Sequence, residues 1–224
     1  MQYYSFSLKN REDKMKKILL FLVLILPMSG FASEGSVREI KSCFDSFKKY
    51  VMEKKGNEFI SCVNKRSISY CSELVEDSLY LPADKFSSLS MIDRYLIMRI
   101  NISIPMGILL KMYGKEFLIY SVSNGWFTDE FIPSLTIDNV AINGDTAHAD
   151  IYQNGRNTGA KYKFMKEDGQ WKFVFISHFA IINSSLKSYQ LKSGKSENDY
   201  LKGILQPLVD YRLDDYIFEP VLKK

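Results

Sequence analysis

The chain has 224 residues, 46% of them hydrophobic, and its formal charge is +4. This composition excludes a disordered or fibrous chain, and the length is enough for one domain with a substantial core. The positive charge is concentrated in residues 1–32, without which the formal charge is about +1. Because nucleic-acid binding relies on a strongly positive field, we expect no nucleic-acid partner.

Residues 15–32 have the pattern of a secretory signal peptide. Two lysines precede an apolar run from Ile18 to Met28, and small residues follow it. The run is too short to span a membrane in the mature protein. We therefore expect a periplasmic or secreted protein without membrane attachment. Residues 1–14 are then an upstream extension before the natural start at Met15.

Three cysteines follow the predicted signal peptide: Cys43, Cys62 and Cys71. An oxidising compartment favours one disulfide and one free thiol. Cys62 and Cys71 are the preferred pair because only a short polar segment separates them. Cys43 with Cys62 is the alternative, if both lie on facing helices. The spacing predicts no metal site, and no histidine lies nearby in the sequence to activate a catalytic thiol.

The N-terminal half predicts helices. Apolar residues recur at steps of three and four from Val37 to Val51, after Ser36 as a candidate cap. Further helices are predicted at residues 57–63, 72–79, 87–100 and 105–112. The periodicity of residues 115–123 fits a helix and a strand equally well.

Residues 135–179 predict four short strands joined by three tight turns. The turns are Gly144-Asp145, Asn154-Gly155 and Asp168-Gly169, which favour two-residue hairpin loops. Such loops fix which residues lie opposite each other. The predicted opposite pairs are Ile142 with Ala147, Val140 with Ala149, Ala149 with Ala160, Ala147 with Tyr162, Phe164 with Phe173, and Tyr162 with Phe175.

Alternation along these strands divides the side chains between two faces. One face is apolar, with alanines on the middle strands and aromatic rings, including Tyr162, on the last two. The other face carries His148, Asp150, Lys161 and Lys163. Helices followed by an antiparallel meander indicate an α+β fold, with the N-terminal helices packed on one face of a curved sheet.

Three segments resemble the secreted branch of the nuclear-transport-factor-2-like superfamily, also called SnoaL-like or ketosteroid-isomerase-like. They are the helix Val37–Val51, the strand pair VAINGDTAHADI and the hairpin KFMKEDGQWKF. The resemblance covers roughly residues 36–182. It implies a cone-shaped half-barrel around a pocket, for which we place a domain at residues 36–186. The superfamily includes isomerases, dehydratases, cyclases and non-enzymes, so the function has to come from the site.

Isomerase-like members of this superfamily place an Asp base and a Tyr/Asp oxyanion pair inside the cone. Tyr162 lies on the predicted concave face, but the strands supply no inward carboxylate. A base would have to come from Asp93 or Glu116. The candidate pocket residues are Tyr162, Arg99, Tyr95, Asp93 and Trp126. Arg99 is either an anion clamp at the pocket mouth, or the ion-pair partner of Asp93 or Glu116, or a side chain whose stem lies over apolar surface.

The same register places His148 and Asp150 on the outer face, outside the pocket. We therefore interpret them, together with Lys161 and Lys163, as residues that face a partner. His178 follows the last strand and fits a structural, hydrogen-bonded role at the rim.

Residues 187–224 predict a C-terminal helical extension. Ser196 is a candidate cap, an apolar stripe runs from Leu201 to Val209, and Pro207 interrupts it. This tail could fold over the pocket, form a homodimer or dock on another protein.

The sequence favours a non-catalytic binding or interaction domain whose partner is a protein or a small apolar ligand. One form of this function is an immunity protein that neutralises a periplasmic toxin. The alternative is a cofactor-independent lyase or isomerase of the ketosteroid-isomerase type. No motif for a cofactor or a metal is present in the sequence.

Overall fold

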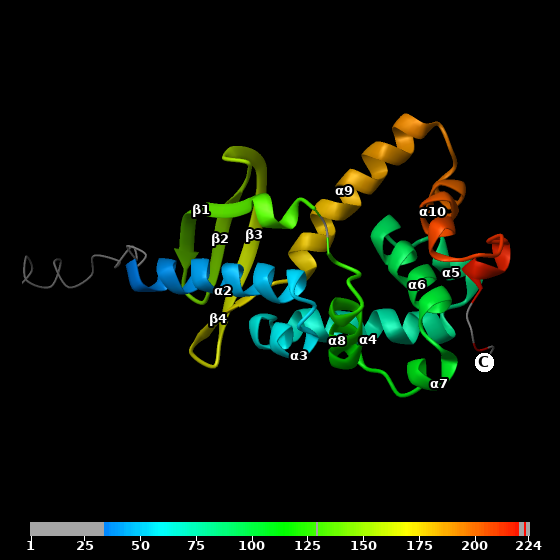
Figure 1. The fold of residues 1–224 in the computed structure, drawn as a ribbon, viewed down its shortest axis with the longest axis horizontal. Helices are drawn as coiled ribbons and strands as arrows, with labels where there is room; N and C mark the ends of the chain where they lie inside the picture. The colour runs from blue at the N-terminus through cyan, green and yellow to red at the C-terminus, as the bar shows by residue number, and fades with distance from the viewer. Residues whose placement is uncertain (1–33, 129, 220–221, 223–224) are drawn as a thin grey trace, which may run out of the picture.

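The computed structural model describes residues 34–128, 130–219 and 222, which form an α+β fold with one antiparallel sheet. The predicted fold class is therefore confirmed at this level. The predicted signal peptide, residues 15–32, and the extension before it lie outside the described residues. In Figure 1 the sheet occupies one end of the molecule and most helices gather at the other. Within the described part, no helix combines the length and apolarity needed to cross a membrane.

The sheet has four strands in the order β1-β2-β3-β4. They are β1 (Leu135–Asn143), β2 (Thr146–Gln153), β3 (Arg156–Glu167) and β4 (Gln170–Phe173). Both residues of the Asn154-Gly155 turn and both of the Asp168-Gly169 turn have positive φ, as type I′ loops require. The three predicted hairpin turns are thus confirmed.

The predicted pairing holds near the turns and fails beyond two irregularities. Ile142 lies opposite Ala147 and Phe164 lies opposite Phe173, as predicted. A bulge between Asp138 and Ala141, where Asn139 has a φ of 50°, removes Val140 from its predicted place opposite Ala149.

The pairing of β2 with β3 is wrong by two residues. Ala149 lies opposite Tyr162 rather than Ala160, and Ala147 lies opposite Phe164 rather than Tyr162. The cause is a second irregularity after Asp150, next to Gly159, whose φ of 76° favours glycine. A shift of two residues keeps every side chain on its predicted face, so Tyr162 still points into the core.

The last predicted strand is too long. β4 ends at Phe173, and a helix, α9 (Ile176–Ser193), begins three residues later. Phe175 is the residue that precedes this helix, so it does not pair with Tyr162. The centre of its ring nevertheless lies 6.3 Å from the centre of the Phe173 ring. The apolar run from Phe173 to Ile176 suits a strand and a buried helix start equally, and periodicity alone could not separate them.

The N-terminal half is helical, as predicted, but the helix predicted at residues 72–79 begins earlier and a short helix at residues 83–86 was not predicted. The helices of this half are α2 (Glu34–Met52), α3 (Gly56–Phe59), a 3₁₀ turn η1 (Ile60–Cys62), α4 (Lys65–Tyr80), α5 (Ala83–Phe86), α6 (Met91–Ser103), α7 (Met106–Leu109) and α8 (Gly114–Ser123). The ambiguous residues 115–123 are helical. A side chain at Gly114 would meet the backbone oxygen of Ile68 at 1.9 Å, so this glycine allows α8 to approach α4 closely.

Helix α2 covers the apolar face of the sheet. The centre of the Phe173 ring lies 6.2 Å from the ring centre of Phe44 and 4.5 Å from that of Phe47. The ring centre of Tyr162 lies 5.0 Å from it. All four side chains are at most 2% exposed. Burial of one such ring contributes about 2–3 kcal/mol, so this layer is the main tie between helices and sheet.

The C-terminal residues pack on the helices rather than on the sheet. The Ser196 hydroxyl accepts a hydrogen bond from the backbone of Asp199 (3.1 Å) and caps α10 (Glu197–Leu205). The buried guanidinium of Arg94, on α6, forms an ion pair with Glu197. Two 3₁₀ turns follow, η3 (Gln206–Leu208) and η4 (Asp215–Phe218), while a third, η2 (Ile132–Ser134), precedes the sheet. The boundary that we placed between residues 186 and 187 lies within α9.

Candidate functional site

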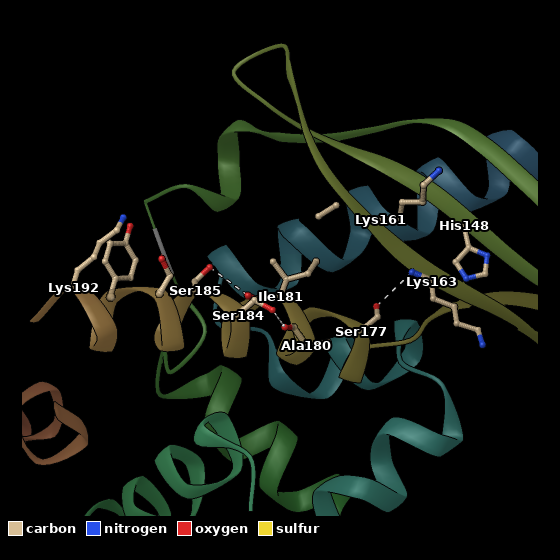
Figure 2. A pocket seen from close by; sticks show the side chains of 12 residues that line it. His148, Lys161, Lys163, Ser177, Ala180, Ile181, Ser184, Ser185 and Lys192 are labelled. Atoms are coloured by element: carbon tan, nitrogen blue, oxygen red, sulfur yellow. Dashed lines mark hydrogen bonds between the residues drawn. The ribbon is translucent and has the colours of Figure 1, made fainter. Parts of the chain in front are cut away.

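A groove of about 740 Å³ lies between strand β3 and helix α9. Figure 2 shows Lys161, Lys163 and His148 on the sheet side, and serines with Lys192 along the helix. Three of the four residues interpreted as partner-facing therefore line one groove. The fourth, Asp150, lies beside it as the ion-pair partner of Lys161 (2.8 Å).

The groove exists because β4 is short. β4 pairs with β3 only at residues 164–167, and the preceding part of β3 has no strand on that side among the described residues. The chain leaves the sheet there: the backbone of Val174 still donates to the carbonyl of Lys163 (2.9 Å). The backbone N–H of Lys163 then donates to the hydroxyl of Ser177 on α9 (3.4 Å). Helix α9 thus runs away from an open strand edge.

The groove carries positive charge. Lys161, Lys163 and Lys192 line it, and no carboxylate does. Within the described residues, Lys163 and Lys192 are in no ion pair. Only Lys161 is partly neutralised, and its hydrogen bond holds the pKa of Asp150 below the ordinary value, with a second contribution from Asn139. Two of the three groove lysines, Lys163 and Lys192, therefore carry charge without an ion-pair partner among the described residues.

The helix side of the groove carries four serines together with Ala180, Ile181 and Tyr189. Ser184 and Ser185 donate to the carbonyls of Ala180 (3.1 Å) and Ile181 (3.3 Å), four residues earlier. Their oxygens keep lone pairs for a bound donor. The Tyr189 side chain is 61% exposed at the far end, with the Lys192 ammonium 5.6 Å from its ring centre. The helix side therefore offers hydrogen-bonding oxygens and apolar surface side by side.

The contribution of α9 to the groove was missed from the sequence. Two signals could have found the helix. Phe179, Ile182 and Leu186 recur at steps of three and four, and Gly194 follows the last turn in the left-handed conformation typical of helix ends.

The predicted pocket inside the sheet is largely filled. The ring of Tyr162 contacts those of Phe44, Phe173 and His178. Burial raises the pKa of Tyr162, so its hydroxyl stays protonated and can donate to His178 Nδ1, 2.9 Å away. The cavity that His178 lines has a volume of only about 200 Å³.

The two acids proposed as bases lie elsewhere. Asp93 accepts a hydrogen bond from the hydroxyl of Tyr70. Glu116 accepts one from the backbone of Tyr113 (3.2 Å) at the start of α8. Among the described residues, no carboxylate lines the cavity beside His178.

The structure brings together three other pocket candidates. Arg99 donates to the hydroxyl of Tyr95 (2.9 Å) and to the carbonyl of Trp126 (3.3 Å), and its guanidinium lies 4.6 Å from the centre of a Trp126 ring. Trp126 lines the small cavity beside His178. Arg99 therefore fixes Trp126 by a cation–π contact and is not placed as an anion clamp.

The preferred disulfide is not formed, since all three cysteines are free. Cys71 faces the core from α4 with no exposed area, and burial raises its pKa. Cys62 ends η1 and contacts Cys43 of α2 instead: the Cys43 sulfur lies 3.8 Å from the carbonyl oxygen of Cys62. The short polar link between Cys62 and Cys71 starts helix α4, and the helix carries the second thiol away from the first.

Comparison with protein-family models, curated proteins and solved structures finds no match to this chain.

Proposed function

We propose that this protein is a secreted, non-catalytic interaction domain that binds an acidic, extended segment of a partner protein in the groove between β3 and α9. The observation that carries the proposal is the composition of the groove: three lysines and a histidine line it, and no carboxylate does. Complementary charge gives such contacts their specificity and speed of association.

The open edge of β3 supports an extended occupant. Backbone groups at an unpaired strand edge can pair with a strand from another chain, and the flanking side chains then select its sequence. The edge is unpaired only before Lys163, whose own backbone groups are bonded to Val174 and Ser177. An added strand would therefore pair from Lys161 toward the start of β3, with the side chain of Lys163 beside its end. Acidic residues of the added strand could form an ion pair with Lys163, which has no ion-pair partner among the described residues.

The cavity beside His178 is small for a ligand site. Its volume of about 200 Å³ lies below the ordinary range of small-molecule sites, about 300–1,000 Å³. The isomerase alternative needs an inward carboxylate near Tyr162. Asp93 and Glu116 are engaged elsewhere, so binding is the function that the geometry favours.

The proposal includes the compartment and the fold family predicted from the sequence. A signal peptide at residues 15–32 would deliver the domain to the periplasm or outside the cell. The cone-shaped half-barrel of the nuclear-transport-factor-2-like superfamily would provide the sheet, with the tail after it. An immunity protein that neutralises a secreted toxin is one form of this function, because toxin inhibitors commonly use dense complementary charge.

Site-specific photo-crosslinking tests the proposal. A photoreactive residue at Tyr189, which lines the groove, is compared with one at Tyr113, which is 73% exposed outside it. The full chain is expressed with its own N-terminal segment, and crosslinked peptides are sequenced. We expect Tyr189 alone to capture a peptide rich in Asp and Glu, with a yield that falls as salt rises. Equal capture at both positions, or capture of a basic or apolar peptide at Tyr189, would contradict the proposal.

A further inference from the structure

A second cavity, of about 680 Å³, lies between helix α2, turn η1 and strand β4. It shares no lining residue with the groove between β3 and α9. Two of the three cysteines, Cys43 and Cys62, line it together, with Arg38 and Lys172 beside them. The cavity therefore combines two thiols with positive charge.

The two cysteines are neighbours in space. The Cys43 thiol donates to the carbonyl oxygen of Cys62, with the sulfur 3.8 Å from that oxygen. Cys43 is partly exposed, whereas Cys62 is 6% exposed at the cavity wall. The third cysteine, Cys71, lies in the apolar core and lines none of the described cavities.

The surroundings make the two thiols chemically unequal. The hydrogen bond from Cys43 lowers the pKa of Cys62 to about 7, helped by the Ser61 hydroxyl and the Lys172 charge and opposed by burial. The same hydrogen bond and burial raise the pKa of Cys43. Lys172 is fixed there because its ammonium donates to the Ser61 carbonyl (2.6 Å). Arg38 and Glu39 face the same cavity from α2.

We propose that Cys43 and Cys62 form a reactive dithiol that exchanges with a small, carboxylate-bearing disulfide entering this cavity. The volume fits a small molecule, and Arg38 with Lys172 would attract its carboxylates. Cys62 is the attacking thiol and Cys43 is the resolving thiol. Glutathione disulfide is the probe of this class.

The exchange takes two steps. The Cys62 thiolate attacks one sulfur of glutathione disulfide, the S–S bond of the probe breaks, and one glutathione thiolate leaves. Cys43 then gives its proton to that thiolate or to water, and its own thiolate attacks the Cys62 sulfur. The second glutathione thiolate leaves as the Cys43–Cys62 disulfide forms. Two electrons pass from the pair to the probe, which is reduced to two glutathione molecules.

Mass spectrometry of the reduced, folded full chain after treatment with glutathione disulfide tests the proposal. We expect the chain to lose two hydrogen atoms, to keep no adduct, and to yield one crosslinked peptide that joins Cys43 to Cys62. The variant Cys43→Ser should retain one glutathione on Cys62, because it lacks the resolving thiol. The matched control Cys71→Ser should behave as the unchanged chain.

Three results would overturn the proposal: a disulfide that includes Cys71, a stable adduct on the unchanged chain, or reaction only after unfolding. Peptide mapping of the unchanged chain decides the matter even where a serine variant does not fold. The groove and this cavity share no lining residue. None of these three results would therefore count against the proposed binding of a partner in the groove.

Discussion

The two faces of the sheet are built from the same strands and differ in almost every other respect. On the inner face, rings such as Phe164 and Phe173 are fully buried beneath α2. On the outer face and the open edge of β3, Lys161 and His148 are exposed beside a groove. The inner face stabilises the fold and leaves little space for a ligand. The outer face carries Lys163, which has no ion-pair partner among the described residues, and borders the groove proposed for binding.

Removal of an inner ring should have the largest effect on stability. The substitution Phe173→Ala deletes a side chain with no exposed area that contacts four other rings on α2 and the sheet. We expect a loss of about 3–5 kcal/mol in the free energy of unfolding, measured by urea denaturation. Tyr189→Ala, in the groove, should change it by less than about 0.5 kcal/mol. Similar losses for both would erase the contrast between the faces.

Oxidation of the Cys43–Cys62 pair should have the second largest effect on the free energy of unfolding. These residues are 19 positions apart, and closure of a loop of that length stabilises a chain by about 3 kcal/mol through the unfolded state. We expect a higher urea midpoint for the oxidised chain than for the reduced chain. The gain should vanish in Cys43→Ser and persist in Cys71→Ser. A lower midpoint after oxidation would show that the disulfide strains the contact between α2 and η1.

Loss of the inner hydrogen bond should have a smaller effect. Tyr162→Phe keeps the ring contacts but removes the hydroxyl that lies 2.9 Å from His178 Nδ1. We expect a cost of about 1 kcal/mol in the free energy of unfolding, because the half-buried imidazole loses the tyrosine hydroxyl as a partner. An unchanged unfolding curve would mean that water replaces the hydroxyl, and hence that the inner face is wetter than its packing indicates.

The smallest expected effect lies on the outer face. The hydrogen bond from Lys161 depresses the pKa of Asp150 in the folded protein. A carboxyl of this kind contributes stability above its unfolded pKa and loses it as the pH falls through its lower folded pKa. The variant Lys161→Ala should raise the pKa of Asp150, followed by NMR titration of the carboxyl carbon. Lys111→Ala, outside the groove, should leave it unchanged.

The parts of the fold that depend on local chemistry were predictable. The dipeptides Asn154-Gly155 and Asp168-Gly169 defined two hairpins, and alternation placed Lys161, Lys163 and His148 on the outer face. The pairing failed where Asn139 and Gly159 adopt positive φ within strands, since such irregularities depend on how the whole sheet curves. Neither irregularity changed the alternation of side chains over more than a few residues. The residues were therefore assigned to the correct face of the sheet, although some were assigned to the wrong opposite residue.

Only one side of the groove, the side formed by the sheet, could be predicted from the sequence. Its sheet side follows from alternation, but its helix side depends on where β4 ends. The residues from Phe173 to Ile176 are all apolar, and helix α9 begins at their end. It begins there because Phe175 and Phe179 pack against α2, α3 and the segment at Phe127. Such contacts between distant segments are invisible to a reading of neighbouring residues. The same holds for Cys43 and Cys62, which are brought together by the packing of α2 on η1.

The most direct test of the account is the binding of a fluorescent oligo-glutamate peptide, followed by anisotropy. We compare the unchanged chain with Lys163→Glu/Lys192→Glu, which reverses the two groove lysines that have no ion pair among the described residues. The control is Lys111→Glu/Lys115→Glu, which makes the same change of charge on exposed lysines elsewhere. We predict a loss of at least about tenfold in affinity for the groove variant and a much smaller loss for the control. Equal losses in both would show that only net charge matters and would contradict a binding site between β3 and α9.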